Sequence, residues 1–130
     1  MDTLSYRGLG NRDLADAKIL LKHGGSPSAA GRLIQQAVEK HLKQAIEESG
    51  NINLLPLLKV HNTIKLYDRV VELGLLKLNK DDRKMMSVIK DYYYDLNYPG
   101  ENNMELTLEE AEEAWAFAER VINELVKLDE

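Results

Sequence analysis

The chain has 130 residues, a formal net charge of −5 and no cysteine. This length is typical of one domain, so residues 1–130 are predicted to form a single domain with its own core. The lack of cysteine excludes disulfides and cysteine-ligated zinc, and the acidic balance argues against a strongly basic surface for duplex nucleic acid. Because no apolar run approaches the roughly 20 residues that span a bilayer, and the first residues lack the apolar core of a secretory signal, we expect a cytoplasmic protein without membrane association.

The first predicted helix runs from about Asn11 to His23. Asn11 is a suitable N-cap, and the pair Gly24 and Gly25 supplies a stop. The apolar positions recur at helical spacing, at Leu14, Ala17 and Leu21.

The second predicted helix has the clearest signals. Ser26 is a suitable N-cap, Pro27 fits the first helical position, and Ser49 and Gly50 end the segment. An apolar stripe runs from Ala30 to Ile46, which is typical of a helix that faces the core. Polar side chains are expected to line the opposite, solvated face, at Arg32, Gln36, Glu39 and Lys43.

A loop containing Pro56 is predicted next, followed by a third helix from about Asn62 to Leu73. This helix has apolar residues on two sides, so it either lies at the centre of the bundle or is partly buried by another chain. We prefer the central position.

The fourth predicted helix spans about Lys80 to Leu96, with Asn79 as its cap, and ends at the Tyr98–Pro99 turn. Its apolar stripe comprises Met85, Val88, Ile89, Tyr92 and Leu96. The last helix opens with a capping box between Thr107 and Glu110. Its inward side is predicted to comprise Ala111, Ala114, Trp115, Ala118, Val121, Ile122 and Leu125.

These elements predict an all-α fold, an antiparallel up-and-down bundle of four main helices plus a short one. The three histidines show no paired spacing for a metal, and no glycine-rich phosphate loop or nucleophile motif occurs, so neither a metal site nor a cofactor is predicted. His41 is expected to be a buried, hydrogen-bonded core residue, and His61 to cap or contact a neighbouring helix end.

A modest polar patch is the best candidate for binding. Arg32, Gln36 and Lys43 share one side of the second helix, with Lys40 at its margin. Such a patch suits a phosphate or an acidic partner surface, although Glu39 also fits a plain solvated face.

The segment from Gly31 to Ala45 resembles the second helix of the HEPN family, through its Gln-Gln-Ala-Val-Glu-Lys core at residues 35–40. Three further features agree in order: the Asp-Leu-Ala-Asp-Ala run at residues 13–17, His61 before the third helix, and the Tyr98–Pro99 turn before Thr107. The resemblance spans nearly the whole chain.

This resemblance implies a helical bundle that is often homodimeric and commonly prokaryotic. HEPN proteins are often encoded beside a nucleotidyltransferase-like partner, as toxin–antitoxin or nucleotide-handling pairs. Catalytic members are metal-independent ribonucleases that carry an arginine followed, after four to six residues, by a histidine. No arginine of this chain has a histidine at that spacing.

The resulting hypothesis is a non-catalytic HEPN-type module, expected to be homodimeric, that binds a nucleotide, RNA or a nucleotidyltransferase-like partner. Its candidate ligand-binding residues are Arg32, Gln36, Lys40, Lys43, Asn97, Tyr98 and Asn102. One alternative is a divergent ribonuclease toxin that uses His61 or His41 across a dimer interface. Another is a purely structural dimeric scaffold.

Overall fold

The computed structural model describes residues 5–92 and 105–127, and these residues form helices and no strand. The helices are α1 (Tyr6–Lys22), α2 (Pro27–Glu48), the 3-10 helix η1 (Ile52–Lys59), α3 (Thr63–Glu72), α4 (Lys80–Lys90) and α6 (Leu108–Lys127). The predicted all-α bundle is confirmed. None of the described helices is both long enough and apolar enough to cross a membrane.

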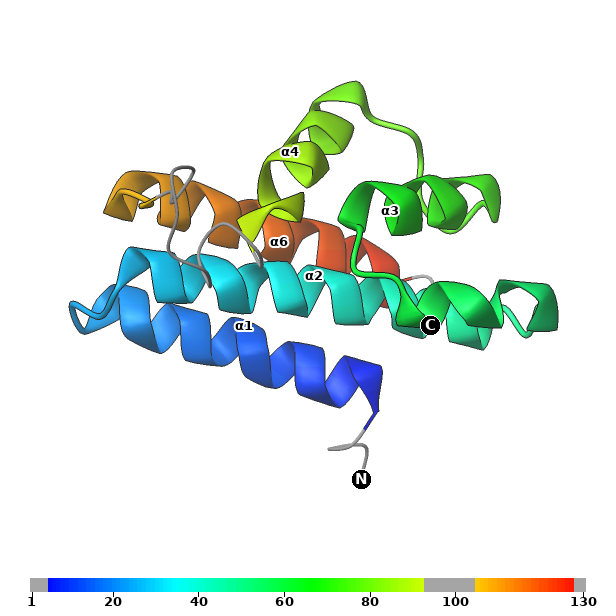
Figure 1. Cartoon of the computed structure of the whole chain (residues 1–130), viewed down its shortest axis with the longest axis horizontal. Coiled ribbons are helices and arrows are strands. Elements are labelled where there is room, and N and C mark those ends of the chain that lie inside the picture. Colours follow the sequence, from blue (N-terminus) through cyan, green and yellow to red (C-terminus); the bar gives the residue numbers. More distant parts are fainter. Residues whose placement is uncertain (1–4, 93–104, 128–130) are drawn as a thin grey trace.

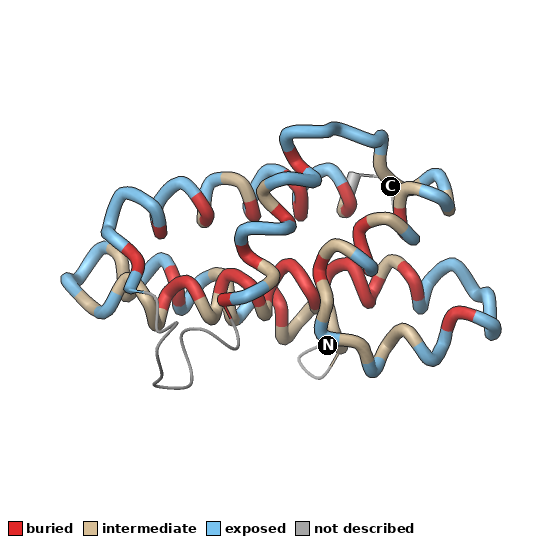
Figure 2. Tube along the Cα trace, turned by 45° about the horizontal axis from the view of Figure 1, so that its top comes forward, coloured by how far each residue is buried: buried red, intermediate tan, exposed pale blue. Residues whose placement is uncertain are grey.

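Helix α2 occupies the centre of the bundle. It contacts α1, α3, α4, α6 and η1, and Figure 1 shows α1, α2 and α6 lying alongside one another with α3 and α4 above them. Buried positions recur along its length (Figure 2). A helix covered on so many sides buries residues all round its axis, including polar ones.

Helices α1 and α2 form an antiparallel pair, as expected for neighbours joined by a short turn (Figure 1). Helix α6 instead runs in the same direction as α2. The backbone N–H of Leu106, just before α6, donates to Ser28 Oγ in the first turn of α2. The far ends of the two helices also meet, where Leu125 lines a pocket together with Glu48.

Helix α1 begins at Tyr6, so the predicted start at Asn11 is wrong. Ser5 is the N-cap, and its Oγ accepts a hydrogen bond from the backbone N–H of Gly8 at 3.0 Å. Gly10 is buried against α2, where a Cβ atom would lie 2.7 Å from Cδ2 of His41. This glycine therefore serves close helix packing.

The predicted start of α2 is confirmed. The Oγ of Ser26 accepts from the backbone N–H of Ala29 at 3.1 Å, and Pro27 is the first helical residue. The expectation that Glu39 and Lys43 lie on a solvated face is wrong, because both are buried. Arg32 and Gln36 are partly exposed.

The segment around Pro56 is a 3-10 helix, η1, and the predicted loop is wrong. Asn51 caps η1 by accepting from the backbone N–H of Asn53 at 3.0 Å. Among its apolar side chains only Leu54 is buried, while Ile52 and Leu55 are exposed.

Helix α3 begins close to the predicted start at Asn62, which is its N-cap: Asn62 Oδ1 accepts from the backbone N–H of Lys65 at 3.2 Å. One side is buried, at Leu66, Tyr67 and Val70. The helix packs against α2 and α4, so the preferred central position is wrong for α3 and belongs to α2.

Helix α4 is capped by Asn79 as predicted but ends at Lys90 rather than Leu96. Ile89 and Tyr92 are buried, whereas Val88 is half exposed and Met86 takes its place in the core. Position 96 and the turn at 98–99 lie outside the described residues.

The capping box of α6 is confirmed. Thr107 N–H donates to Glu110 Oε1 at 3.0 Å, and Glu110 N–H donates to Thr107 Oγ1 at 3.1 Å. All seven predicted inward residues of α6 are buried or packed against the core, and Ala111 is buried outside the main cluster.

Candidate functional site

Four polar side chains form a connected row where α2 meets the start of α3. We call this set the polar row: Gln35, Glu39, Lys43 and His61. The carboxylate of Glu39 is its hub, because Oε1 accepts from Lys43 Nζ at 2.8 Å and from His61 Nδ1 at 2.7 Å. The other oxygen, Oε2, accepts from Gln35 Nε2 at 2.8 Å. Three residues one turn apart on α2 are thereby joined to His61, which lies two positions before the first residue of α3.

The polar row combines a buried ion pair, Glu39 with Lys43, and a half-exposed histidine, His61. The side chains of Glu39 and Lys43 are only 3% and 6% exposed, whereas that of His61 is 49% exposed. A buried charge needs partners of opposite sign and full hydrogen bonding, and Glu39 has both. Since an ionised carboxylate only accepts, Nδ1 of His61 must donate, which makes Nε2 the acceptor nitrogen of the neutral ring.

The rim of the polar row contains two of the predicted ligand-binding residues. Gln36 Nε2 donates to Gln35 Oε1 at 2.7 Å, which links this partly exposed amide to the row. Arg32, also partly exposed, lies one turn before Gln36 on α2. The structure therefore brings these two predicted residues together beside the row.

The remaining predicted site residues are placed differently. Lys43 is inside the bundle on Glu39, so its expected position on an exposed patch is corrected. Lys40 forms an ion pair with Asp13 of α1 at 2.5 Å. Asn97, Tyr98 and Asn102 lie outside the described residues.

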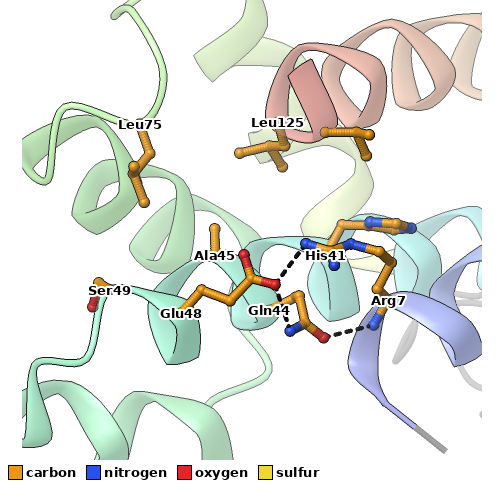
Figure 3. Close-up of a pocket in the computed structure, with 9 residues that line it drawn as sticks. Arg7, His41, Gln44, Ala45, Glu48, Ser49, Leu75 and Leu125 are labelled. Atoms are coloured by element: carbon orange, nitrogen blue, oxygen red, sulfur yellow. Dashed lines mark hydrogen bonds and ion pairs between the residues drawn. The ribbon is translucent and has the colours of Figure 1, made fainter. Parts of the chain in front are cut away.

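A second polar cluster lies where α1, α2 and α6 meet, and its side chains line a pocket of about 110 Å³ (Figure 3). The Arg7 guanidinium donates to Glu48 Oε1 at 2.7 Å, and Gln44 Nε2 donates to the same oxygen at 2.9 Å. The Arg7 backbone N–H donates to Gln44 Oε1 at 2.9 Å, which fixes the start of α1 on the end of α2. Apolar side chains close the pocket, among them Leu75 and Leu125.

His41 lines this pocket and is held in its neutral form. Its burial is as predicted, with 3% of the residue exposed, but one of its ring nitrogens, Nε2, has no hydrogen-bond partner. Burial, together with the positive charge of Arg7, lowers the pKa of His41 to about 4. A neutral, enclosed imidazole supplies no positive charge for a phosphate at neutral pH.

His61 contacts the middle of α2 rather than a helix end, and Asn62 is the residue that caps α3. His61 therefore contacts the carboxylate of Glu39, although the two residues are 22 positions apart in the chain.

A comparison with protein-family models matches the HEPN domain over residues 7–128. The chain belongs to the HEPN domain family. This membership supports a function related to nucleotides or RNA in general terms. Searches of curated proteins and of solved structures found no significant match.

In this HEPN chain, sequence reasoning missed Gln35, Glu39 and His61 as a connected site. The spacing of positions 35, 39 and 43 was a usable signal, since residues four apart lie on one side of a helix. No group of three or more metal-ligating side chains occurs within residues 5–92 and 105–127.

Proposed function

We propose that this HEPN chain is a non-catalytic module that binds a nucleotide or RNA at the rim of the polar row. The observation that carries the proposal is the anchoring of the half-exposed imidazole of His61 by the buried carboxylate of Glu39. The contact fixes the orientation of the ring, and fixed groups bind with a smaller loss of conformational entropy.

The rim offers groups that suit a nucleotide. Arg32 carries a guanidinium, whose planar donors match phosphate oxygens, and Gln36 carries an amide that can donate to or accept from a base or ribose. Lys43 does not contact the ligand directly: its ammonium group donates to the carboxylate of Glu39, and that carboxylate orients His61. In this proposal Lys40, Asn97, Tyr98 and Asn102 are further contacts.

A thermal-shift screen of the purified chain against nucleoside phosphates and short single-stranded RNA tests the proposal. A ligand at one hundred times its dissociation constant adds about 2.7 kcal/mol to the free energy of unfolding. For a domain of this size the melting temperature should rise by at least about 5 °C. Inorganic phosphate and a DNA oligonucleotide of the same sequence are the controls. A flat response to every nucleotide and RNA would contradict the proposal.

A second candidate function is ribonuclease activity, and the Glu39–His61 contact favours it. A histidine with one nitrogen on a carboxylate and the other as acceptor is the arrangement of a general base. The chain lacks the family's arginine–histidine spacing, and for that reason the binding module is our primary proposal.

RNA integrity on a denaturing gel separates the two functions. The binding module leaves RNA intact in wild-type protein. A ribonuclease cleaves it, and His61→Asn abolishes the cleavage while His23→Asn, on the exposed end of α1, does not.

The wider setting follows from family resemblance and is part of the proposal. We propose a cytoplasmic homodimer that pairs with a nucleotidyltransferase-like protein, as in a toxin–antitoxin system. Light scattering after size-exclusion chromatography measures the oligomeric state, and a single protomer mass at micromolar concentration would contradict the homodimer. An intact RNA with no thermal shift would favour the protein partner or a structural scaffold.

A further inference from the structure

A pocket between α1 and α6 lies apart from the polar row and shares no residue with it. The pocket has a volume of about 230 Å³ and is lined by Lys18, Leu21, Lys22, Glu112 and Trp115. The two lysines lie one turn apart on α1, and the tryptophan lies on α6.

The indole of Trp115 is held in a fixed position. Its Nε1–H donates to the backbone oxygen of Leu14 at 2.9 Å, so α1 sets the orientation of the ring. The ammonium group of Lys18 lies over the ring, with Nζ 4.6 Å from the ring centroid. The pocket therefore combines an oriented aromatic ring with a cation on its face.

The local charge of the pocket is opposite to that of the whole chain. Lys18 and Lys22 supply two positive charges and Glu112 one negative charge, whereas the chain carries a formal net charge of −5. Aromatic rings beside basic side chains are the usual elements of sequence-tolerant sites for single-stranded nucleic acid, where bases stack and lysines meet phosphates.

We propose that this pocket is a nucleotide subsite in which a base stacks on Trp115 and its phosphate binds Lys18 and Lys22. The inference rests on the proposed function, because it assigns a second binding point for the same class of ligand. The volume lies below the roughly 300–1,000 Å³ of pockets that enclose a whole drug-sized ligand, which suits one base with its phosphate at the rim.

Binding requires Lys18 to leave the face of the Trp115 ring. The contacts that form on binding are stronger than the cation–π contact that is lost. Stacking of a base on an aromatic side chain is stronger than a cation–π contact at an exposed site. The displaced ammonium group then lies at the rim, where a phosphate provides a stronger ionic partner than the ring.

The emission of Trp115 reports on this pocket directly, because it is the single tryptophan of the chain. We would titrate the full chain with uridine monophosphate and, separately, with a short oligouridylate, and follow tryptophan fluorescence. A saturable change with both ligands identifies a site for a free nucleotide. A change with the oligouridylate alone identifies a site for RNA, and either result supports the subsite.

Two substitutions with opposite expected signs sharpen the test. Lys22→Gln should weaken the affinity measured by fluorescence by roughly tenfold, because one phosphate contact is lost. Glu112→Gln should strengthen it by roughly threefold, because a negative charge beside the phosphate is removed. Lys84→Gln, at an exposed position of α4, is the matched control and should leave the affinity unchanged. Uridine is chosen because uracil has no exocyclic amino group that could donate to Glu112.

Failure of the subsite and failure of the proposed function give different results. If RNA raises the melting temperature but leaves Trp115 emission and the Lys22→Gln affinity unchanged, the subsite is wrong and the binding module stands. If neither measurement responds to any nucleotide or RNA, both are wrong. A Lys22→Gln loss no larger than that of Lys84→Gln also overturns the subsite.

Discussion

Glu39 and His41 lie two residues apart on α2, and both are buried. The surroundings of Glu39 compensate a charge, whereas those of His41 disfavour one. Glu39 receives hydrogen bonds from Gln35, Lys43 and His61. His41 has an unpartnered Nε2 and a pKa lowered to about 4, first by burial and then by Arg7. The charge of Glu39 is compensated inside the bundle, whereas the charge of His41 is suppressed.

The difference follows from what each side of α2 faces. The side bearing Glu39 meets the start of α3, where His61 supplies a donor, and the same side carries Lys43. The side bearing His41 packs against α1 at Gly10, where Nε2 of the ring has no hydrogen-bond partner. Glu48 is the acidic group of that cluster, and its Oε1 is bonded to Arg7 and Gln44. One helix therefore supports a polar site on one side and tight packing on the other.

Removal of Glu39 should have the largest effect. Glu39→Ala leaves the ammonium group of Lys43 buried without its partner, and an unpaired buried charge costs about 3–5 kcal/mol. Urea unfolding followed by circular dichroism measures this loss. Glu47→Ala, at an exposed position on the same helix, is the matched control and should change the free energy of unfolding by less than about 0.5 kcal/mol.

The paired variant Glu39→Leu with Lys43→Met separates charge from packing. Replacement of both ions by apolar groups should recover most of the loss, since buried ion pairs are often replaceable in this way. If Glu39→Ala alone loses no more than the Glu47→Ala control, the polar row does not hold a compensated charge.

The pH dependence of His41 should be the next largest effect. Well above pH 6.5 the ring is neutral in both the folded and the unfolded chain, so His41 contributes no pH dependence there. Between pH 6.5 and 4 the unfolded chain binds a proton that the folded chain excludes, so the free energy of unfolding falls as the pH falls. The loss amounts to roughly 3 kcal/mol at pH 4.

His41→Leu isolates this contribution from the carboxylates that titrate in the same range. Urea unfolding at pH 7 and at pH 4.5 should show a smaller loss for the variant than for the wild type, by roughly 2–3 kcal/mol. Parallel losses in the two proteins would mean that the folded chain accommodates a charged His41.

The contact between Gly10 and His41 should give a moderate effect. Gly10→Ala places a Cβ atom 2.7 Å from Cδ2 of the ring, and overpacking of this kind costs about 1–3 kcal/mol. In a His41→Ala background the same change should cost much less, because only the contact with the backbone oxygen of Ala37 at 3.2 Å remains and alanine favours the helix by up to about 1 kcal/mol. A double-mutant cycle from urea unfolding measures the difference, and a coupling energy near zero would contradict the contact.

The ion pair between Lys40 and Asp13 should give the smallest effect. Lys40 lies between Glu39 and His41 in the chain, but its pair with Asp13 is partly exposed. Asp13→Asn should therefore lower the free energy of unfolding by about 1 kcal/mol or less, and high salt should reduce that difference. A loss as large as that of Glu39→Ala, unaffected by salt, would show that partial exposure does not weaken this pair.

Elements set by local chemistry could be predicted from the sequence. The predicted caps at Ser26, Asn79 and Thr107 depend on residues within one turn, and all three are confirmed. The same holds for the apolar side of α6, which follows a regular helical period.

Features that depend on contacts between distant parts of the chain could not be predicted from the sequence. The start of α1 was misplaced because the role of Gly10 depends on His41, which lies 31 positions later in the chain. Glu39 and Lys43 were assigned to a solvated face because their polarity suggests exposure, whereas the helices around α2 bury them. The polar row could not be predicted because it includes His61, whose position beside Glu39 depends on the path of η1.

Binding of a nucleotide or RNA at the rim of the polar row can be measured by equilibrium fluorescence polarisation with labelled single-stranded RNA. We expect saturable binding to the wild type, a roughly tenfold weaker affinity for Arg32→Ala, and no change for Arg69→Ala on the exposed side of α3. Equal affinities for the three proteins, or no binding by the wild type, would contradict the proposal.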